Sequence, residues 1–349
     1  MKILSDSTLS GHHKIYMNEL LKIEETLKFI GDHDNSTKKN FFRYVKNRVK
    51  YIKESLNFGG KKDKKIVHFL YLDYFYLVGA IALPMLLHRK NKNVILIGTI
   101  HHVPQNKLKI RALKAISKNM LIIVHSDYLL DKLKSYEIDN IKCINYPYFP
   151  LSDQKIIHPQ KLLFNNKNKI VFSLLGGTRK DKGLIYFLES LKYWDKEMLD
   201  KSFILIAGNE DFYTKEFIMS YLKMFEIEYH LDLKFIEEAD YQMYLNESDA
   251  IVLPYSKLFS GNSGPMTEGV HHNIPIIGPR HTNIGEIIEK NNLGFTFEVE
   301  NPESLAASIK KFLKNGWSPN LHSKEFKSST DVGKFYLEHD ELYKKLLRS

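Results

Sequence analysis

Cysteine is almost absent from this sequence of 349 residues, which contains only Cys143. A single cysteine excludes a disulfide framework and any zinc site built on several thiolates, and it is typical of a reducing compartment. The N-terminus turns polar after Ile3 and Leu4, so no signal peptide is expected and the protein is predicted to be cytoplasmic.

A long hydrophobic run without polar residues is also missing. The most apolar window, residues 66–87, contains His68, Asp73 and Pro84. We interpret this window as a buried strand followed by a buried helix, and not as a membrane span.

Negative charge is scarce in the first part of the chain. Residues 1–150 contain 26 Lys and Arg against 13 Asp and Glu, whereas residues 151–349 contain 25 against 28. The basic first part favours an anionic partner, which could be nucleic acid, an acidic membrane surface or a lipid-linked phosphate. Because no RNA- or DNA-reading motif is recognised, no nucleic-acid partner is expected.

A basic amphipathic helix is predicted over residues 40–56. Its apolar residues fall on one helical face, and Arg43, Lys46, Lys50 and Lys53 lie mostly on the others. Such a helix could rest peripherally on the cytoplasmic face of a membrane. The alternative is a helix packed on its own sheet with solvated lysines.

The most informative stretch, residues 249–279, has the pattern of a strand, a small-residue loop, a helix and a second strand. The loop contains Asn262, Ser263 and Gly264, and its backbone N–H groups at a helix N-terminus would suit a phosphate. Glu268 lies about one turn into the helix, where its carboxylate could accept two ribose hydroxyls. The alternative is an ordinary strand–loop–helix of a doubly wound domain.

This stretch resembles the sugar-nucleotide site of family 4 (group 1) glycosyltransferases. The usual form of that site is a glutamate, seven residues, a second glutamate and then Gly-x-Pro-Val-Ile. Glu268 matches the second glutamate by its spacing to Pro275, whereas Ser260 stands at the first glutamate position. Residues 262–264 resemble a variant of the family that carries a Ser-Gly loop.

A second motif follows the strand predicted at residues 169–175. Gly176, Arg179, Lys182 and Gly183 fit the Gly-x-x-Arg-x-x-Lys-Gly pattern of the family. Glycines let the backbone approach a ligand. The arginine would donate two parallel hydrogen bonds to a diphosphate, and the lysine would supply a compact positive charge. Lys182 is followed by glycine, so this is not a Walker loop. A solvated basic turn is the alternative.

In the first part, a strand at residues 94–100 is followed by His101 and His102, at the kind of strand end where open α/β sheets bind ligands. The family commonly shows Thr-x-His here, and the resemblance implies that His101 contacts the transferred sugar or the acceptor hydroxyl. The alternative is a loop histidine with a structural hydrogen bond. Gly11 and His12 follow the first strand and are candidate acceptor residues together with His102, although a simple turn would also explain them.

Other elements are expected by pattern. A helix is predicted over residues 15–30, strands over 203–209 and 233–238, and a terminal helix over 330–347. The one Asp-x-Asp, Asp32-His33-Asp34, lies in a polar loop, and we do not expect it to bind a metal.

The resemblance implies an α/β protein of the GT-B fold, with two Rossmann-like domains that face each other across a cleft. The expected borders are an acceptor domain at 1–150, a linker at 151–168, a donor domain at 169–325 and a terminal helix at 326–349 that packs back on the acceptor domain. The donor would be a nucleotide-diphosphate sugar, without a metal or other cofactor. The acceptor would be a saccharide or a polyprenyl-diphosphate-linked glycan, and the transfer a retaining one of the hexosyltransferase type.

The candidate residues carry two roles. Catalysis is assigned to His101, Glu268, Arg179 and Lys182. Donor binding is assigned to Gly176, Gly177, Arg179, Lys182, Asn209, Asn262, Ser263, Gly264 and Glu268. Ser260 in place of a glutamate leaves open a catalytically inactive relative that binds a sugar nucleotide or a partner enzyme, and the basic first part leaves open a nucleic-acid-binding protein.

Overall fold

The computed structural model describes residues 2–6, 12–23, 27–31, 41–58, 64–87, 93–104, 106–149, 169–259 and 261–348. By its contacts the chain divides into two units, Met1–Tyr146 with Val332–Ser349, and Pro147–Asp331. Gly11, Ser260, the Asp-x-Asp at 32–34 and the expected linker at 151–168 lie outside the described residues. In the ranges that are described, no helix is long and apolar enough to cross a membrane.

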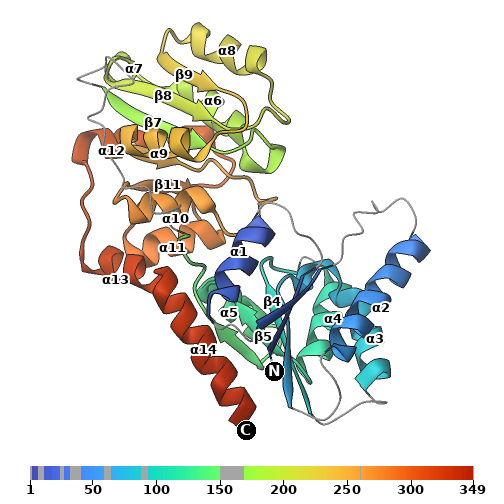
Figure 1. The fold of residues 1–349 in the computed structure, drawn as a ribbon. Helices are drawn as coiled ribbons and strands as arrows, with labels where there is room; N and C mark the ends of the chain where they lie inside the picture. Colours follow the sequence, from blue (N-terminus) through green and yellow to red (C-terminus); the bar gives the residue numbers. More distant parts are fainter. Residues whose placement is uncertain are drawn as a thin grey trace. The chain divides into compact units, whose positions relative to one another are not determined.

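The first unit contains a six-stranded parallel sheet in the order β2-β1-β3-β4-β5-β6 (Figure 1). Its strands are β1 Lys2–Asp6, β2 Leu27–Gly31, β3 Lys65–Phe69, β4 Val94–Ile100, β5 Leu121–Val124 and β6 Ile141–Cys143. Its helices are α1 His12–Leu21, α2 Phe41–Asn57, the 3₁₀ turn η1 Leu72–Tyr74, α3 Tyr76–Leu87, α4 Lys107–Ser117, α5 Asp127–Lys134 and α14 Val332–Arg348.

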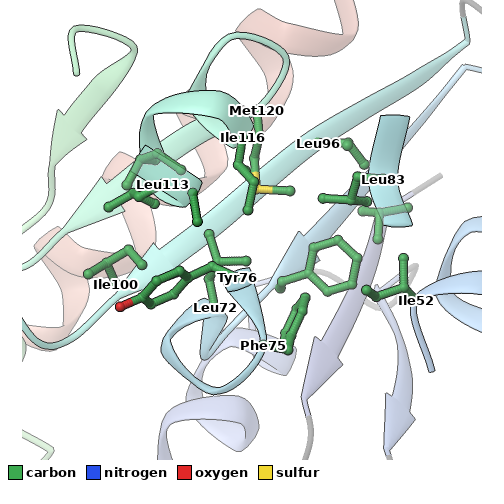
Figure 2. Packing of buried hydrophobic residues seen from close by; sticks show 14 of the residues in the cluster. Ile52, Leu72, Phe75, Tyr76, Leu83, Leu96, Ile100, Leu113, Ile116 and Met120 are labelled. Atoms are coloured by element: carbon green, nitrogen blue, oxygen red, sulfur yellow. The ribbon is translucent and has the colours of Figure 1, made fainter. Parts of the chain in front are cut away.

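The hydrophobic core of the first unit lies between the sheet and α2, α3 and α4. Figure 2 shows Ile52 of α2, Leu83 of α3 and Ile116 of α4 packed in one cluster with Leu96 of β4. The central strands read as nearly continuous apolar runs because both of their faces are covered. The window at 66–87 therefore contains the predicted buried strand, but helix α3 is buried on one side only, since Ile81 and Met85 are 71% and 68% exposed.

The basic helix predicted over residues 40–56 is α2, and the structure shows it packed on its own sheet. Tyr51, Ile52 and Leu56 of α2 are buried in the core, so its apolar face is covered by its own unit. Arg43 and Lys46 point to solvent.

The helix predicted over 15–30 is wrong in its second half. Helix α1 ends at Leu21, and Leu27–Gly31 forms the edge strand β2, which pairs in parallel with β1 from Lys2↔Leu27 to Asp6↔Gly31. Five backbone positions gain a partner strand there, and this tertiary pairing outweighs the weak local preference for helix.

A cluster of buried histidines joins the sheet of the first unit to α14. In β3, His68 bonds the Tyr343 hydroxyl through Nδ1 and the Thr99 hydroxyl through Nε2, both at 2.7 Å. His339 of α14 and His125 after β5 each give Nδ1 to a backbone carbonyl, and their Nε2 atoms have no hydrogen-bond partner in the part of the chain that is described. Burial lowers the pKa of His125 to about 4 and that of His339 to about 3, and it lowers the pKa of His68 well below its ordinary value.

These pKa values predict that the first unit loses stability in mild acid. Above the ordinary pKa of 6.5, neither state binds the proton; below it, the unfolded chain binds protons that the folded unit does not. We expect the free energy of unfolding to fall by about 2 kcal/mol for each of His125 and His339 between about pH 7 and about pH 5. Native-state hydrogen exchange of β3 and β5 would measure this. The surface variant His322→Gln should keep the slope and His339→Leu should reduce it, whereas equal protection at both pH values would contradict the prediction.

The second unit contains another six-stranded parallel sheet, in the order β12-β11-β10-β7-β8-β9. Its strands are β7 Ile170–Leu175, β8 Ser202–Ala207, β9 Glu228–Asp232, β10 Ala250–Val252, β11 Ile276–Pro279 and β12 Gly294–Phe297. Its helices are the 3₁₀ turns η2 Lys180–Lys182 and η3 Leu191–Tyr193, and α6 Leu184–Ser190, α7 Lys196–Lys201, α8 Lys215–Met224, α9 Glu238–Glu247, α10 Gly264–His271, α11 Asn283–Asn291, α12 Pro302–Asn315 and α13 Leu321–Ser329.

The strand predicted at 233–238 is wrong. The strand is β9, five residues earlier, paired with β8 from Phe203↔Glu228 to Ala207↔Asp232. Strand β9 lies at the sheet edge with an exposed or half-exposed, largely polar sequence, EYHLD, which local patterning does not distinguish from a loop.

Candidate functional site

The loop after β7 needs glycine for both conformation and space. Gly176 has φ 106° and Gly183 has φ 62°, which side chains other than glycine rarely adopt. A Cβ atom on Gly176 would overlap the ammonium group of Lys182, and one on Gly183 would overlap the carbonyl oxygen of Pro254. The backbone of this loop therefore lies close against Pro254, which follows β10, and beneath the Lys182 side chain.

The turn after β8 supports the same loop. The backbone N–H of Thr178 donates to the carbonyl of Asn209 at 2.9 Å, and the Thr178 hydroxyl accepts from the N–H of Asp211 at 2.8 Å. Gly177 lies so close to Asp211 that a Cβ atom would overlap its carboxylate. Asn209 thus contributes to the predicted site through its backbone, as a support for residues 176–178.

Arg179 is held by an acidic partner that the sequence interpretation missed. Its Nε and Nη2 atoms donate to the two carboxylate oxygens of Asp181, at 3.0 and 2.8 Å. These hydrogen bonds raise the pKa of Arg179, and the Asp181 backbone is fixed in turn by the N–H and hydroxyl of Ser256. One edge of the guanidinium and most of its net charge are therefore already compensated within the loop.

Lys182 is placed differently. Its ammonium group makes only a long contact of 3.5 Å to the carbonyl of Leu175 and lies 5.8 Å from the centre of the Tyr255 ring. None of the ion pairs found among the described residues involves it. A small pocket lined by Gly176, Thr178, Lys182 and Tyr255 opens beside it. Lys180 in the same turn also has no ion pair among the described residues, but it lies over the Phe212 ring, whereas Lys182 lines this pocket.

Helix α10 begins where the sequence predicts. Ser263 caps it by accepting from the N–H of Met266 at 3.3 Å, and the Tyr255 hydroxyl lies 3.1 Å from the same serine oxygen. Asn262 lies half-buried just before the cap, and a Cβ atom on Gly264 would meet nothing within 4 Å. The open N-terminus carries the positive end of the helix dipole, which suits an anion.

Glu268 is half-buried and hydrogen-bonded. The hydroxyl of Tyr241, on α9, donates a short hydrogen bond to its Oε2 atom. Burial raises the pKa of Glu268, while the Tyr241 hydrogen bond and the charge of Lys182 act in the opposite direction. The carboxylate of Glu268 is therefore oriented by its hydrogen bond with Tyr241, and it interacts electrostatically with Lys182 of the neighbouring loop. The sequence gives no local sign of Tyr241, which lies 27 residues from its partner.

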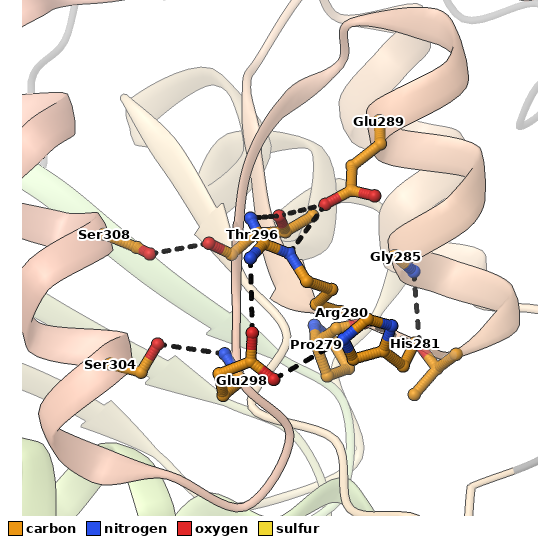
Figure 3. Close-up of polar contacts among 10 residues, drawn as sticks. Pro279, Arg280, His281, Gly285, Glu289, Thr296, Glu298, Ser304 and Ser308 are labelled. Carbon is orange, nitrogen blue, oxygen red and sulfur yellow. Dashed lines mark hydrogen bonds and ion pairs between the residues drawn. The ribbon is translucent and has the colours of Figure 1, made fainter.

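A further cation at the carboxyl edge of this sheet is structural. Figure 3 shows Arg280, which follows β11, between Glu289 and Glu298 at 2.9 and 3.2 Å. Its remaining nitrogen lies 3.3 Å from the Thr296 hydroxyl. Arg280 thus connects the end of β11 to α11 and to the end of β12, and its positive charge is paired with two carboxylates.

In the first unit, the predicted Thr-x-His loop is held by a half-buried carboxylate. Asp73 accepts from the backbone N–H groups of His101 and His102, at 2.9 and 3.0 Å, and its burial raises its pKa. The His101 ring is 6% exposed, stacks on Tyr71 with ring centres 4.0 Å apart, and donates from Nε2 to the carbonyl of Leu70. The structural hydrogen bond left open as the alternative for His101 is therefore present. Contact of His101 with a sugar stays a prediction.

The remaining acceptor candidates are less defined. His102 is exposed. The backbone of His12 begins α1, and its side chain lies outside what the structure describes. Among the described residues, no three His, Cys, Asp or Glu side chains lie close enough together to hold a metal ion.

The whole chain has the fold of known glycosyltransferases. Sucrose-phosphate synthase from Thermosynechococcus elongatus matches with a TM-score of 0.74 at 13% identity, over 100% of this chain and 99% of that one. HepE from Anabaena, solved with UDP, matches with a TM-score of 0.68 at 12% identity over 99% of each chain. A glycosyltransferase from Rickettsia africae matches with a TM-score of 0.68 at 18% identity, over 100% and 99%. The GT-B fold class is thereby confirmed.

The family follows from the sequence itself. Residues 153–328 match the model of the family "Glycosyl transferases group 1", so the chain belongs to that family and is a glycosyltransferase. This confirms the resemblance inferred from the two motifs. A sequence comparison with curated proteins gives no match.

Proposed function

We propose that the protein transfers a hexosyl group from a nucleotide-diphosphate sugar to a saccharide acceptor, with retention of configuration and without a divalent metal. The observation that carries this proposal is the convergence of Lys182, the open N-terminus of α10 and the Tyr241-bound Glu268 at one edge of the second sheet. Together they offer a cation, a row of backbone donors and a carboxylate acceptor.

In this proposal each group meets a different part of the donor. The carboxylate of Glu268 accepts hydrogen bonds from the ribose hydroxyls, and Tyr241 fixes its orientation. The glycines of the loop at 176–183 let the diphosphate approach the backbone. The acceptor hydroxyl oxygen bonds to the anomeric carbon as the bond from that carbon to the diphosphate oxygen breaks, and the hydroxyl proton passes to the leaving diphosphate. The negative charge that grows on the diphosphate is stabilised by the Lys182 ammonium group and the N–H groups at the start of α10.

Arg179 takes a smaller part than the sequence motif implies. Its guanidinium is already bonded to Asp181, so a diphosphate would have to share or displace that carboxylate. We propose that Arg179 mainly shapes the loop and that Lys182 carries the charge stabilisation.

The acceptor is proposed to be a saccharide, free or linked to a polyprenyl diphosphate at the cytoplasmic face of a membrane. His101, His102, Gly11 and His12 remain the candidate acceptor residues. The basic character of residues 1–150 supports an anionic acceptor or surface.

A nucleotide-binding measurement tests the donor site. Trp194 and Trp317, the two tryptophans of the chain, both lie in the second unit, so their fluorescence reports the melting of that unit. We expect one of the nucleotides UDP, GDP, ADP and dTDP to stabilise the second unit. The expected gain in the free energy of unfolding is about 2–4 kcal/mol at a nucleotide concentration of about 100–1,000 times the Kd. UDP is the first choice because HepE, a protein of the same fold, was solved with UDP.

Four variants make the measurement specific. Lys182→Ala and Glu268→Ala should abolish the shift, Tyr241→Phe should weaken it, and Lys180→Ala, in the same turn, should keep it. Melting that no nucleotide shifts would refute the site as drawn. A nucleotide shift without turnover of any nucleotide sugar would favour a binding protein over an enzyme of this kind.

A further inference from the structure

Helix α3 exposes apolar side chains although it has no polar residue to face water. Its sequence is YLVGAIALPMLL, and Leu77, Ile81 and Met85 are 39%, 71% and 68% exposed. Spaced by four residues, these side chains form one stripe on the helix, while Ala82 and Leu83 pack into the core. A contiguous apolar stripe on a surface marks a contact with a partner more often than chance exposure does.

The stripe lies in the middle of a helical layer. Helices α2, α3 and α4 make the connections that lead successively to β3, β4 and β5, which are neighbours in the parallel sheet. Right-handed crossovers in one direction along a sheet place their helices on the same face, and α3 contacts both α2 and α4 (Figure 1). The outward sides of the three helices therefore form one continuous face of the first unit.

Cations border the apolar stripe on both sides. The exposed residues of α2 include Lys46, Lys50 and Lys53, and its only acidic residue is Glu54, 3.8 Å from Lys50. Helix α4, KLKIRALKAIS, contains basic residues and no acidic one, and Leu108 at its start is 66% exposed. The face thus combines an apolar centre with a positive border.

We propose that this α2–α4 face docks on the surface of an anionic lipid bilayer. Leu77, Ile81 and Met85 would enter the interfacial region, and the lysines of α2 and α4 would meet the phosphate headgroups. A second copy of the chain fits less well, because two such faces would bring like charges together. The apolar stripe belongs to α3, because Tyr51, Ile52 and Leu56 of α2 are buried in the core. Phe42, at the start of α2, is 85% exposed.

Vesicle binding tests this directly. The full chain should sediment with vesicles of phosphatidylcholine mixed with phosphatidylglycerol and only weakly with phosphatidylcholine alone. Lys46→Gln and Lys50→Gln should each weaken binding about fivefold. Ile81→Gln and Met85→Gln should each weaken it about tenfold, through the loss of buried apolar area.

Matched controls come from one exposed turn of the second unit. Met224, on α8, is 69% exposed, almost the same as Met85, and Lys223 precedes it. Met224→Gln and Lys223→Gln should leave vesicle binding unchanged. Equal loss in these controls, or equal binding to both kinds of vesicle, would overturn the proposal.

Two other results would distinguish lipid docking from dimerisation and from the proposed donor site. Light scattering that shows a dimer, lost in Ile81→Gln, would assign the stripe to a second copy and overturn the lipid assignment. The lipid bilayer as a partner rests on the proposed function, in which the acceptor can lie at a membrane. Vesicle binding is nevertheless measured without nucleotide. Failure to bind vesicles would therefore leave the nucleotide shift intact, and failure of the nucleotide shift would leave vesicle binding intact.

Discussion

Replacing Lys182 by methionine should lower kcat/KM with the donor by about 100- to 1,000-fold, the usual cost of removing one preorganised group that stabilises transition-state charge. The substitution keeps the length of the side chain and removes only its charge. The ammonium group has no bonded carboxylate among the described residues, so its whole charge is available to a diphosphate. The measurement is steady-state transfer by the purified protein, with folding checked by its melting temperature.

The matched variant is Arg179→Met, three residues earlier in the same loop. Because the Arg179 guanidinium is already bonded to Asp181, this change should cost no more than about tenfold. An equally large loss in both variants would show that Arg179 leaves Asp181 when the donor binds, and it would contradict the smaller role proposed for Arg179 than for Lys182. Lys180→Met, on the exposed side of η2, controls for a general loss of positive charge.

The strand–loop–helix units of the second unit could be predicted from the sequence because their signals are local. The apolar run at 170–175, the glycines that follow it and the Ser263 cap with a proline in the first turn of α10 each act within a few residues.

The parts that failed depend on partners distant in the chain. Strand β2 exists because β1 offers it a pairing edge, and β9 because β8 does. The orientation of Glu268 depends on Tyr241 of another helix, and the loop at His101 on Asp73 beneath it. The pairing of Arg179 with Asp181 is local but depends on the turn η2, which allows two residues in one loop to face each other. The spacing of the motif residues was enough to identify the loops at 176–183 and at His101. It could not show that Arg179 is paired and that Lys182 is not, in the part of the chain that the structure describes.

Replacing Gly208 by alanine should destabilise the second unit by about 3 kcal/mol or more, or about 6–12 °C in Tm for a unit of this size. Gly208 has φ 146°, and a Cβ atom there would overlap the carbonyl group of Gly176 and lie 2.7 Å from its Cα. Both sides of this overlap are backbone, so no side chain can rotate to relieve it. The measurement is the melting of Trp194 and Trp317 fluorescence.

The control is Gly264→Ala, at the start of α10, where an added Cβ atom would meet nothing within 4 Å and φ is not positive. Its Tm should change by no more than about 2 °C. The contrast tests the link between the two turns, because a shift of Gly176 away from residue 208 would also move the backbone beneath Lys182. If Gly208→Ala melted like Gly264→Ala and still bound nucleotide, the close approach of the turns after β7 and β8 would not be what holds the donor loop in place.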